Sequence, residues 1–297
     1  EINDLVFPAL AGSDFDLKSG ELRYSPLLAR SWEFTNQGRD IVFHLLTGAV
    51  WSDGKPVTAR DVQLTYELYG DPDVASVRQA AVEKLRLTNG KLDVSKSVEV
   101  LNDSTVVFHF ARAYPGQMFD VGLPIIPAHI FEGIPRKDLR THAANKSPVG
   151  CGPFALAKWT PLQETTLQPN SSSIVPYPGK LSQLIFRVIP DYRSRLAQTA
   201  SGEIDVVGGL RPEDADKLKD NSSVEVISLA GRDYDFIGWN NIDPQSFQSK
   251  GKKIRPHALF GSSAVRRALT MAINREEIVQ AYLGKHGQQA FGGISPL

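Results

Sequence analysis

Residues 47–62 constrain the fold of this chain more than any other stretch, because a strand end, a tight turn and a helix start follow one another there. The residues before them, 41–46, are mostly β-branched, aromatic or aliphatic and too few for a buried helix, which favours a strand. Asp53 and Gly54 then supply a turn, since aspartate can hydrogen-bond to its own backbone and glycine accepts a positive φ. The sequence therefore predicts a strand that ends in a turn near position 54.

A helix is predicted to begin directly after this turn. Thr58 and Asp61 have the spacing of a capping box, in which the hydroxyl accepts from the amide of Asp61 and the carboxylate accepts from the amide of Thr58. Val57 and Val62 hold the two positions of a hydrophobic staple around this cap. Gly70 stands where a glycine commonly closes a helix, so the helix is expected to end there.

The signals along the chain change in type near Val149. Before it, residues 97–100 and 105–110 have the composition of two strands, and the polar residues 102–104 between them indicate a hairpin. After it, the pattern is strand, helix, strand: residues 184–189, a helix capped by Asp191 and closed by Gly202, and residues 203–207. Further strands are predicted at 224–227 and 235–240. A strand–helix–strand order implies parallel pairing with a right-handed crossover.

Composition and charge limit the classes of protein that fit. The chain has 297 residues, 41% of them hydrophobic and 22% charged, as in ordinary soluble globular proteins. Its 33 basic and 33 acidic residues give a formal net charge of zero, which argues against nucleic acid as the main partner. Cys151 is the single cysteine, so no intrachain disulfide and no cysteine-based metal cluster is expected.

The motifs of enzymes and metal proteins are missing from the sequence. The six histidines include no H-E-x-x-H motif and no pair at i, i+4, and neither G-x-S-x-G nor the phosphate-binding G-x-x-x-x-G-K-[ST] occurs. Gly150, Gly152 and Ala155 match a dinucleotide fingerprint, but Pro153 and the alternating residues after it indicate a strand where that motif needs a helix. We therefore predict no catalytic residue, no metal and no cofactor. A hydrolase with an α/β scaffold stays as the alternative, because catalytic triads are spatial.

Three separated segments, in order along the chain, resemble one known family. The first is residues 29–62, with Ala-Arg-Ser-Trp-Glu-Phe and Trp-Ser-Asp-Gly-Lys-Pro-Val-Thr-Ala-Arg-Asp-Val; the second is residues 201–205 and the third residues 265–279. In these segments the chain resembles the family 5 extracellular solute-binding proteins, the peptide, dipeptide and nickel receptors of ABC importers. One departure is Cys151, at a position where the family usually has threonine.

The resemblance implies an α/β fold of the periplasmic-binding-protein type II class, in which a mixed-sheet lobe carries an inserted β-rich subdomain. The change of signals near Val149 predicts the same layout. Its parts are a discontinuous first lobe of residues 1–11 plus 149–240, an inserted β-rich subdomain of residues 12–148, and the start of a second, truncated lobe at residues 241–297. The chain is accordingly interpreted as a fragment of such a protein.

The resemblance also implies a function: binding of a peptide or similar small solute between the lobes and its delivery to the transmembrane permease subunits of an ABC transporter. An exported protein is expected, periplasmic or anchored at the cell surface, with the signal segment absent from this sequence. Loops that leave parallel strands face the cleft in this type of fold. The candidate ligand-binding residues are Tyr114, Gly208, Gly209, Leu210, Trp239 and Asn240. For Trp239 and Tyr114 a packing role is the alternative.

Overall fold

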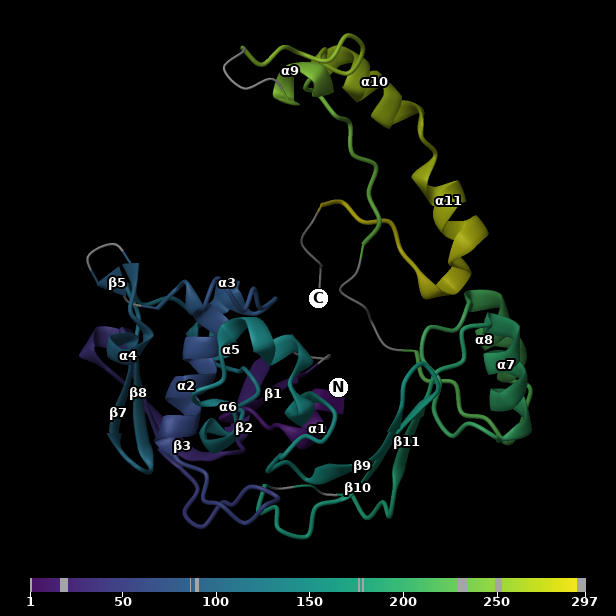
Figure 1. Cartoon of the computed structure of the whole chain (residues 1–297). Helices are drawn as coiled ribbons and strands as arrows, with labels where there is room; N and C mark the ends of the chain where they lie inside the picture. The colour runs from purple at the N-terminus through teal and green to yellow at the C-terminus, as the bar shows by residue number, and fades with distance from the viewer. Residues whose placement is uncertain are drawn as a thin grey trace. The chain divides into compact units, whose positions relative to one another are not determined.

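The computed structural model describes residues 2–16, 21–85, 87–88, 91–175, 177, 179–228, 234–248 and 253–292 (Figure 1). Two compact units divide these residues, the first ending at Val188 and the second beginning at Ile189. Among the described residues, no helix has the length and apolar character needed to cross a membrane. The three-part layout inferred from the sequence stays a prediction beside this two-unit division.

A four-stranded antiparallel sheet forms the centre of the first unit. Its strands are β3 (Ala29–Thr35), β4 (Asp40–Leu45), β8 (Thr105–His109) and β7 (Val98–Asn102), in that order across the sheet. The predicted strand at 41–46 and the predicted hairpin are both confirmed. Burial alternates along β4, where Ile41, Phe43 and Leu45 face the core, because successive side chains of a strand point to opposite faces.

Helix α2 (Ala59–Gly70) lies against this sheet and begins as the sequence predicts. Both halves of the capping box are present, and the amide of Thr58 donates to Asp61 Oδ2 at 2.6 Å. The helix end differs from the prediction, because Gly70 is still helical and the extended Asp71 is the C-cap. Tyr66 of α2 is buried, with its ring 4.8 Å from that of Phe108.

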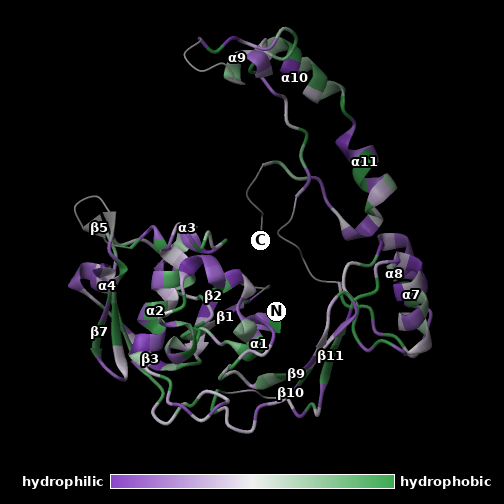
Figure 2. Ribbon diagram, in the orientation of Figure 1, coloured by the Kyte–Doolittle hydropathy of each residue, from purple (hydrophilic) through white to green (hydrophobic). Residues whose placement is uncertain are grey.

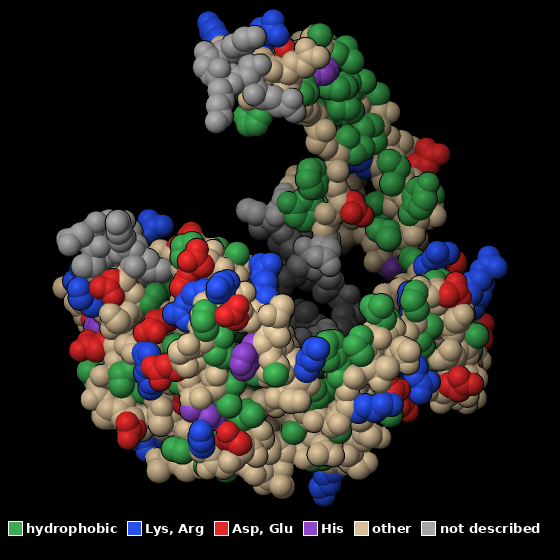
Figure 3. All heavy atoms as spheres, viewed as in Figure 1, with side chains coloured by type: hydrophobic (Ala, Val, Ile, Leu, Met, Phe, Trp, Pro, Cys, Tyr) green, Lys and Arg blue, Asp and Glu red, His purple; other side chains and the backbone are tan. Residues whose placement is uncertain are grey.

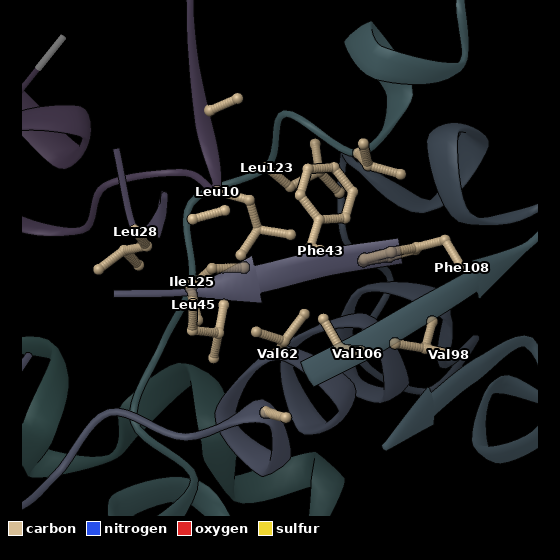
Figure 4. Close-up of a cluster of buried hydrophobic side chains, with 14 of the residues drawn as sticks. Leu10, Leu28, Phe43, Leu45, Val62, Val98, Val106, Phe108, Leu123 and Ile125 are labelled. Atoms are coloured by element: carbon tan, nitrogen blue, oxygen red, sulfur yellow. The ribbon is translucent and has the colours of Figure 1, made fainter. Parts of the chain in front are cut away.

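The main hydrophobic core lies between α2 and the inner face of the four-stranded sheet. Figure 4 shows side chains from both elements converging there, joined by residues of the N-terminal segment and of the loop before α6. The side chains labelled in that view are Leu10, Leu28, Phe43, Leu45, Val62, Val98, Val106, Phe108, Leu123 and Ile125. The strand and the helix predicted on either side of position 54 thus both contribute side chains to the main hydrophobic core.

Short elements complete this part of the first unit. They are α1 (Ile2–Val6), the hairpin of β1 (Ala11–Phe15) with β2 (Leu22–Pro26), η1 (Asn36–Gly38), α3 (Gln79–Val82), the hairpin of β5 (Leu87–Thr88) with β6 (Lys91–Leu92), α4 (Val94–Ser97), α5 (Gln117–Asp120), α6 (Ala128–Phe131), η2 (Arg136–Thr141) and η3 (Ala143–Asn145).

A second antiparallel sheet follows, formed by β9 (Phe154–Thr160), β10 (Glu164–Pro169) and β11 (Leu184–Arg187) in the order β11-β10-β9. The strand β9 after Pro153 confirms that Gly150 and Gly152 open no helix. These glycines pass instead against the backbone of α1, where Gly152 N donates to Val6 O at 2.9 Å. The dinucleotide interpretation is therefore rightly rejected.

The second unit contains α7 (Tyr192–Ser201), α8 (Pro212–Leu218), α9 (Pro244–Gln248), α10 (Ser263–Ala272), α11 (Arg275–Tyr282) and η4 (Gly284–His286). The ends of α7 are as predicted, because Asp191 Oδ1 accepts from Ser194 N at 2.7 Å and Gly202 adopts a left-handed φ of 78°. Helix α10 has both hydrophobic and hydrophilic positions (Figure 2). None of the side chains of α10 or α11 is buried, and hydrophobic side chains gather on the surface of this region (Figure 3).

The predicted crossover with parallel strands is wrong for the described residues. Strand β11 pairs antiparallel with β10, and residues 203–207, 224–227 and 235–240 form no strand in the part of the chain that the structure describes. A segment with high strand propensity forms a strand only when a neighbouring strand pairs with its backbone amides and carbonyls. Among the described residues, no segment pairs with any of these three stretches through a ladder of backbone hydrogen bonds.

Candidate ligand-binding site

Three of the six candidate residues form one exposed loop between α7 and α8. Gly208 and Gly209 are exposed and Leu210 is half-buried. A Cβ atom at either glycine would meet no other atom within 4 Å, so close packing does not require glycine there. Gly209 has a φ of +71°, a conformation that glycine adopts without strain. The loop therefore presents open backbone to the solvent.

The loop is held at its end by Tyr192, a residue that the sequence did not single out. The Tyr192 hydroxyl donates to Asp214 Oδ2 at 2.8 Å and accepts from the backbone amide of Arg211 at 3.1 Å. Burial, together with the Asp214 carboxylate, raises the pKa of Tyr192, so the hydroxyl keeps the proton that it donates. This tyrosine joins the start of α7 to the start of α8 and fixes where the loop ends.

The ring of Tyr192 also carries two guanidinium groups. That of Arg211 lies 4.5 Å from the ring centroid and that of Arg195 lies 5.6 Å from it. Arg195 additionally donates to the carbonyl of Ile189 at 2.8 Å. Residues 192 and 211 are nineteen positions apart, so no periodicity in the sequence indicates that they meet.

Trp239 and Asn240 are engaged in local structure of the second unit. Trp239 Nε1 donates to Thr270 Oγ1 of α10 at 3.0 Å, and its ring lies 5.3 Å from that of Phe260. Asn240 Oδ1 accepts from the amide of Ile242 at 3.2 Å, which is an Asx turn. These contacts are the packing role named as the alternative for Trp239, and a role in ligand binding stays a prediction.

Tyr114 belongs to the first unit, and its hydroxyl is already occupied. It donates to Oδ2 of the buried Asp120 at 2.5 Å, and Lys84 Nζ contacts the same carboxylate at 3.0 Å. Burial and this hydrogen bond raise the pKa of Tyr114. The ring packs edge-on against Phe110 at 5.7 Å between centroids. If Tyr114 contacts a ligand, it therefore does so through the exposed part of its ring and not through its hydroxyl.

The first unit also contains an apolar cavity of about 630 Å³. It lies between α1, the end of α2, the segment 126–148 and strands β9 and β10, with Tyr69, Phe131 and Trp159 among its lining residues. None of the six candidate residues lines it. The cavity is thus separate from the residues that the sequence singled out.

One group of side chains has the composition of a catalytic triad. Ser228 Oγ lies 3.5 Å from His286 Nδ1, and His286 Nε2 lies 3.1 Å from Asp216 Oδ1. The same Asp216 oxygen is 2.8 Å from Lys285 Nζ, and Lys285 and His286 together lower the pKa of Asp216. Ser228 is exposed and its contact is at the limit of hydrogen-bond reach, whereas an activated nucleophile needs a close hydrogen bond to its base. The group has the geometry of a surface ion pair.

Chemistry based on metal or thiol finds no support in the described residues. None of their histidine, cysteine, aspartate and glutamate side chains form a group of three or more that could hold a metal ion. Cys151 is buried, and burial raises the pKa of its thiol, which keeps it in the unreactive protonated form.

A sequence profile of the bacterial extracellular solute-binding proteins, family 5 (middle region), matches residues 23–297. The chain belongs to this family, as its three signature segments indicate.

Two relatives and one solved structure illustrate the similarity. The oligopeptide-binding protein AppA of Bacillus subtilis (strain 168) is 30% identical over 100% of this chain and 50% of its own length. Di/tripeptide-binding protein 1 of Pseudomonas aeruginosa (strain UCBPP-PA14) is 26% identical over 96% of this chain and 54% of its own length. The structure of B. subtilis AppA in complex with a nonapeptide matches 99% of this chain and 53% of that chain, with a TM-score of 0.77 and 27% identity.

These matches confirm the predicted α/β fold of the periplasmic-binding-protein type II class. The chain spans about half the length of the curated relatives that it matches. The predicted family is confirmed as well, by residues well beyond the three signature segments.

Proposed function

We propose that this protein is the extracytoplasmic substrate-binding component of an ABC importer, which binds peptides or a related small solute and delivers them to the transmembrane permease subunits. The observation that carries the proposal is the similarity to AppA along the whole chain, together with the fold shared with the peptide-bound AppA structure. Both named relatives are peptide-binding proteins. Peptides are therefore the first ligands to test.

The described residues add a supporting argument. The glycine loop at 208–210 offers open backbone, and a peptide in extended form is bound largely through main-chain hydrogen bonds. The triad-like group at Ser228 lacks the close contacts of an activated nucleophile. We propose binding without catalysis, no cofactor and no nucleic-acid partner, with the protein located in the periplasm or anchored at the cell surface.

Ligand-dependent unfolding tests this proposal. The natural protein that contains residues 1–297 is heated with a defined pool of di- to nonapeptides, and the peptides are analysed afterwards by mass spectrometry. A ligand that binds the folded state raises its stability with concentration by mass action, so the unfolding midpoint should rise and the peptides should be recovered intact. Cleaved peptides would support the hydrolase alternative, and a midpoint that no peptide changes would contradict peptide binding.

A further inference from the structure

We infer that Arg211 recognises a carboxylate group of the bound peptide, an inference that rests on the proposed function. The observation behind it is the cluster of Arg195, Tyr192 and Arg211, in which two guanidinium groups lie over one tyrosine ring. A guanidinium over an aromatic ring is held in a fixed orientation, and its planar donors match a carboxylate with two parallel hydrogen bonds.

The cluster carries positive charge that no carboxylate of the described residues balances directly. Neither guanidinium is ion-paired with an aspartate or glutamate in the part of the chain that the structure describes. Two carboxylates act on the cluster, but both are engaged: Asp191 accepts from Ser194, and Asp214 accepts from Tyr192 and lies 3.5 Å from Lys217 Nζ. Two like charges beside one ring repel each other, so an added anion there is favoured.

Arg211 rather than Arg195 is the residue available to a ligand. Arg195 is half-buried and donates to the carbonyls of Ile189 and Pro190, at 2.8 and 3.1 Å. Arg211 is exposed, and its hydrogen bonds to the described residues come from its backbone: the amide donates to the Tyr192 hydroxyl, and the carbonyl accepts from the amides of Asp214 and Ala215. Within the described part of the chain its guanidinium has no hydrogen-bond acceptor, so its donors can face a ligand while the Tyr192 ring holds the group in place.

The position of Arg211 in the chain connects it to the candidate site. It directly follows Gly208, Gly209 and Leu210, where open space surrounds the two glycines. A peptide whose backbone approaches these glycines would bring a carboxylate within reach of the next residue along the chain. The recognised group is either the C-terminal carboxylate or the side chain of a glutamate or aspartate.

Four synthetic peptides distinguish these two sources. Trialanine is compared with its C-terminal amide, and Ala-Glu-Ala amide is compared with Ala-Gln-Ala amide, by calorimetric titration of the natural protein that contains residues 1–297. The members of each pair differ by one carboxylate. A charge-assisted pair at an exposed site is expected to give a preference of about two- to fivefold for the acid in one of the two comparisons.

Variants then assign the preference to Arg211. Arg211→Gln should bring the acid-to-amide ratio close to one, whereas Arg193→Gln should keep it, because Arg193 is exposed on α7 and its loss changes the net charge equally. Arg211→Lys should retain part of the preference, since lysine keeps the charge but not the planar fork. The unfolding midpoint of each variant is measured alongside.

Each outcome decides one question. If the peptides bind but the ratio is the same in the natural protein and in Arg211→Gln, the inference is wrong and the proposed function stands. If none of the four peptides binds, the proposed function is contradicted together with the inference. Should Arg211→Gln be too unstable to titrate, an undiminished ratio in Arg211→Lys would rule out recognition by the guanidinium.

Discussion

Replacement of Gly152 by alanine is the sharpest test of how the first unit is assembled. A Cβ atom at this position would lie 2.2 Å from the carbonyl oxygen of Leu5 and 2.9 Å from the carbonyl carbon of Val6. Both atoms belong to the backbone of α1 and cannot rotate away as a flexible side chain would. The substitution therefore has to push α1 away from the segment that leads into β9.

The expected cost combines three contributions, two that destabilise the folded protein and one that opposes them. Overfilling a packed site costs about 1–3 kcal/mol, and weakening the 2.9 Å hydrogen bond from Gly152 N to Val6 O costs about 0.5–1.5 kcal/mol more. The lower entropy of the unfolded alanine chain returns about 0.4–1 kcal/mol. We expect Gly152→Ala to lower the free energy of unfolding of the first unit by about 1–4 kcal/mol.

Gly116→Ala provides the matched control in the same unit. Gly116 has a φ of −87°, and its Cβ would meet the Tyr114 ring at 3.4 Å, which is ordinary contact. Urea unfolding followed by tryptophan fluorescence reports mainly on the first unit, because Trp32, Trp51 and Trp159 lie there. If Gly152→Ala unfolds at the same urea concentration as Gly116→Ala and the natural protein, the close approach to α1 is refuted.

Two further predictions concern the turn and the cap around position 54. Thr58→Ala should lower the free energy of unfolding by about 0.5–2 kcal/mol, the usual effect of removing an N-cap. Asp61→Ala should lower it further, because the buried Asp61 also accepts from the amide of Ala128 at 2.6 Å. Equal urea midpoints for the two variants would contradict this order. Burial favours the neutral form of Asp53, but the hydrogen bonds from His129 at 2.7 Å and from the backbone amide of Lys55 at 3.2 Å, with the electrostatic effect of both residues, together outweigh it and lower the Asp53 pKa from its ordinary 3.8. A lowered pKa gives stability that is present above the unfolded value and lost as the pH falls through the folded one. His129→Ala should therefore destabilise at pH 6 by less than about 1 kcal/mol, and the difference should shrink below pH 3.8; a constant difference across pH 3 to 6 would show that His129 does not act through Asp53.

Local signals in the sequence were sufficient for several elements of the fold. The box formed by Thr58 and Asp61, the cap at Asp191 and the left-handed Gly202 depend on residues within one helical turn of each other, so their spacing is visible in the sequence. The alternation along β4 is local in the same way. These elements were predicted because the groups that stabilise them are neighbours in the chain.

The family was also accessible from the sequence, because its signature segments are contiguous runs of residues. The type of fold followed from that resemblance, and the comparisons along the whole chain confirm both. The prediction of ligand contacts at Gly208 to Leu210 depends on a strand at residues 203–207, which the described structure does not contain. The loop itself is present and exposed.

Only the tertiary structure decided which polar groups meet over long separations in sequence. Strands at 203–207 and 224–227 depend on partners elsewhere, and propensity does not reveal whether a partner is there. Lys84 Nζ contacts the buried Asp120 across a separation of 36 residues, and the Tyr192 hydroxyl accepts from the backbone amide of Arg211, 19 residues away. Such pairings arise when packing brings distant segments together, because burial makes an unpaired polar group costly and so selects its partner.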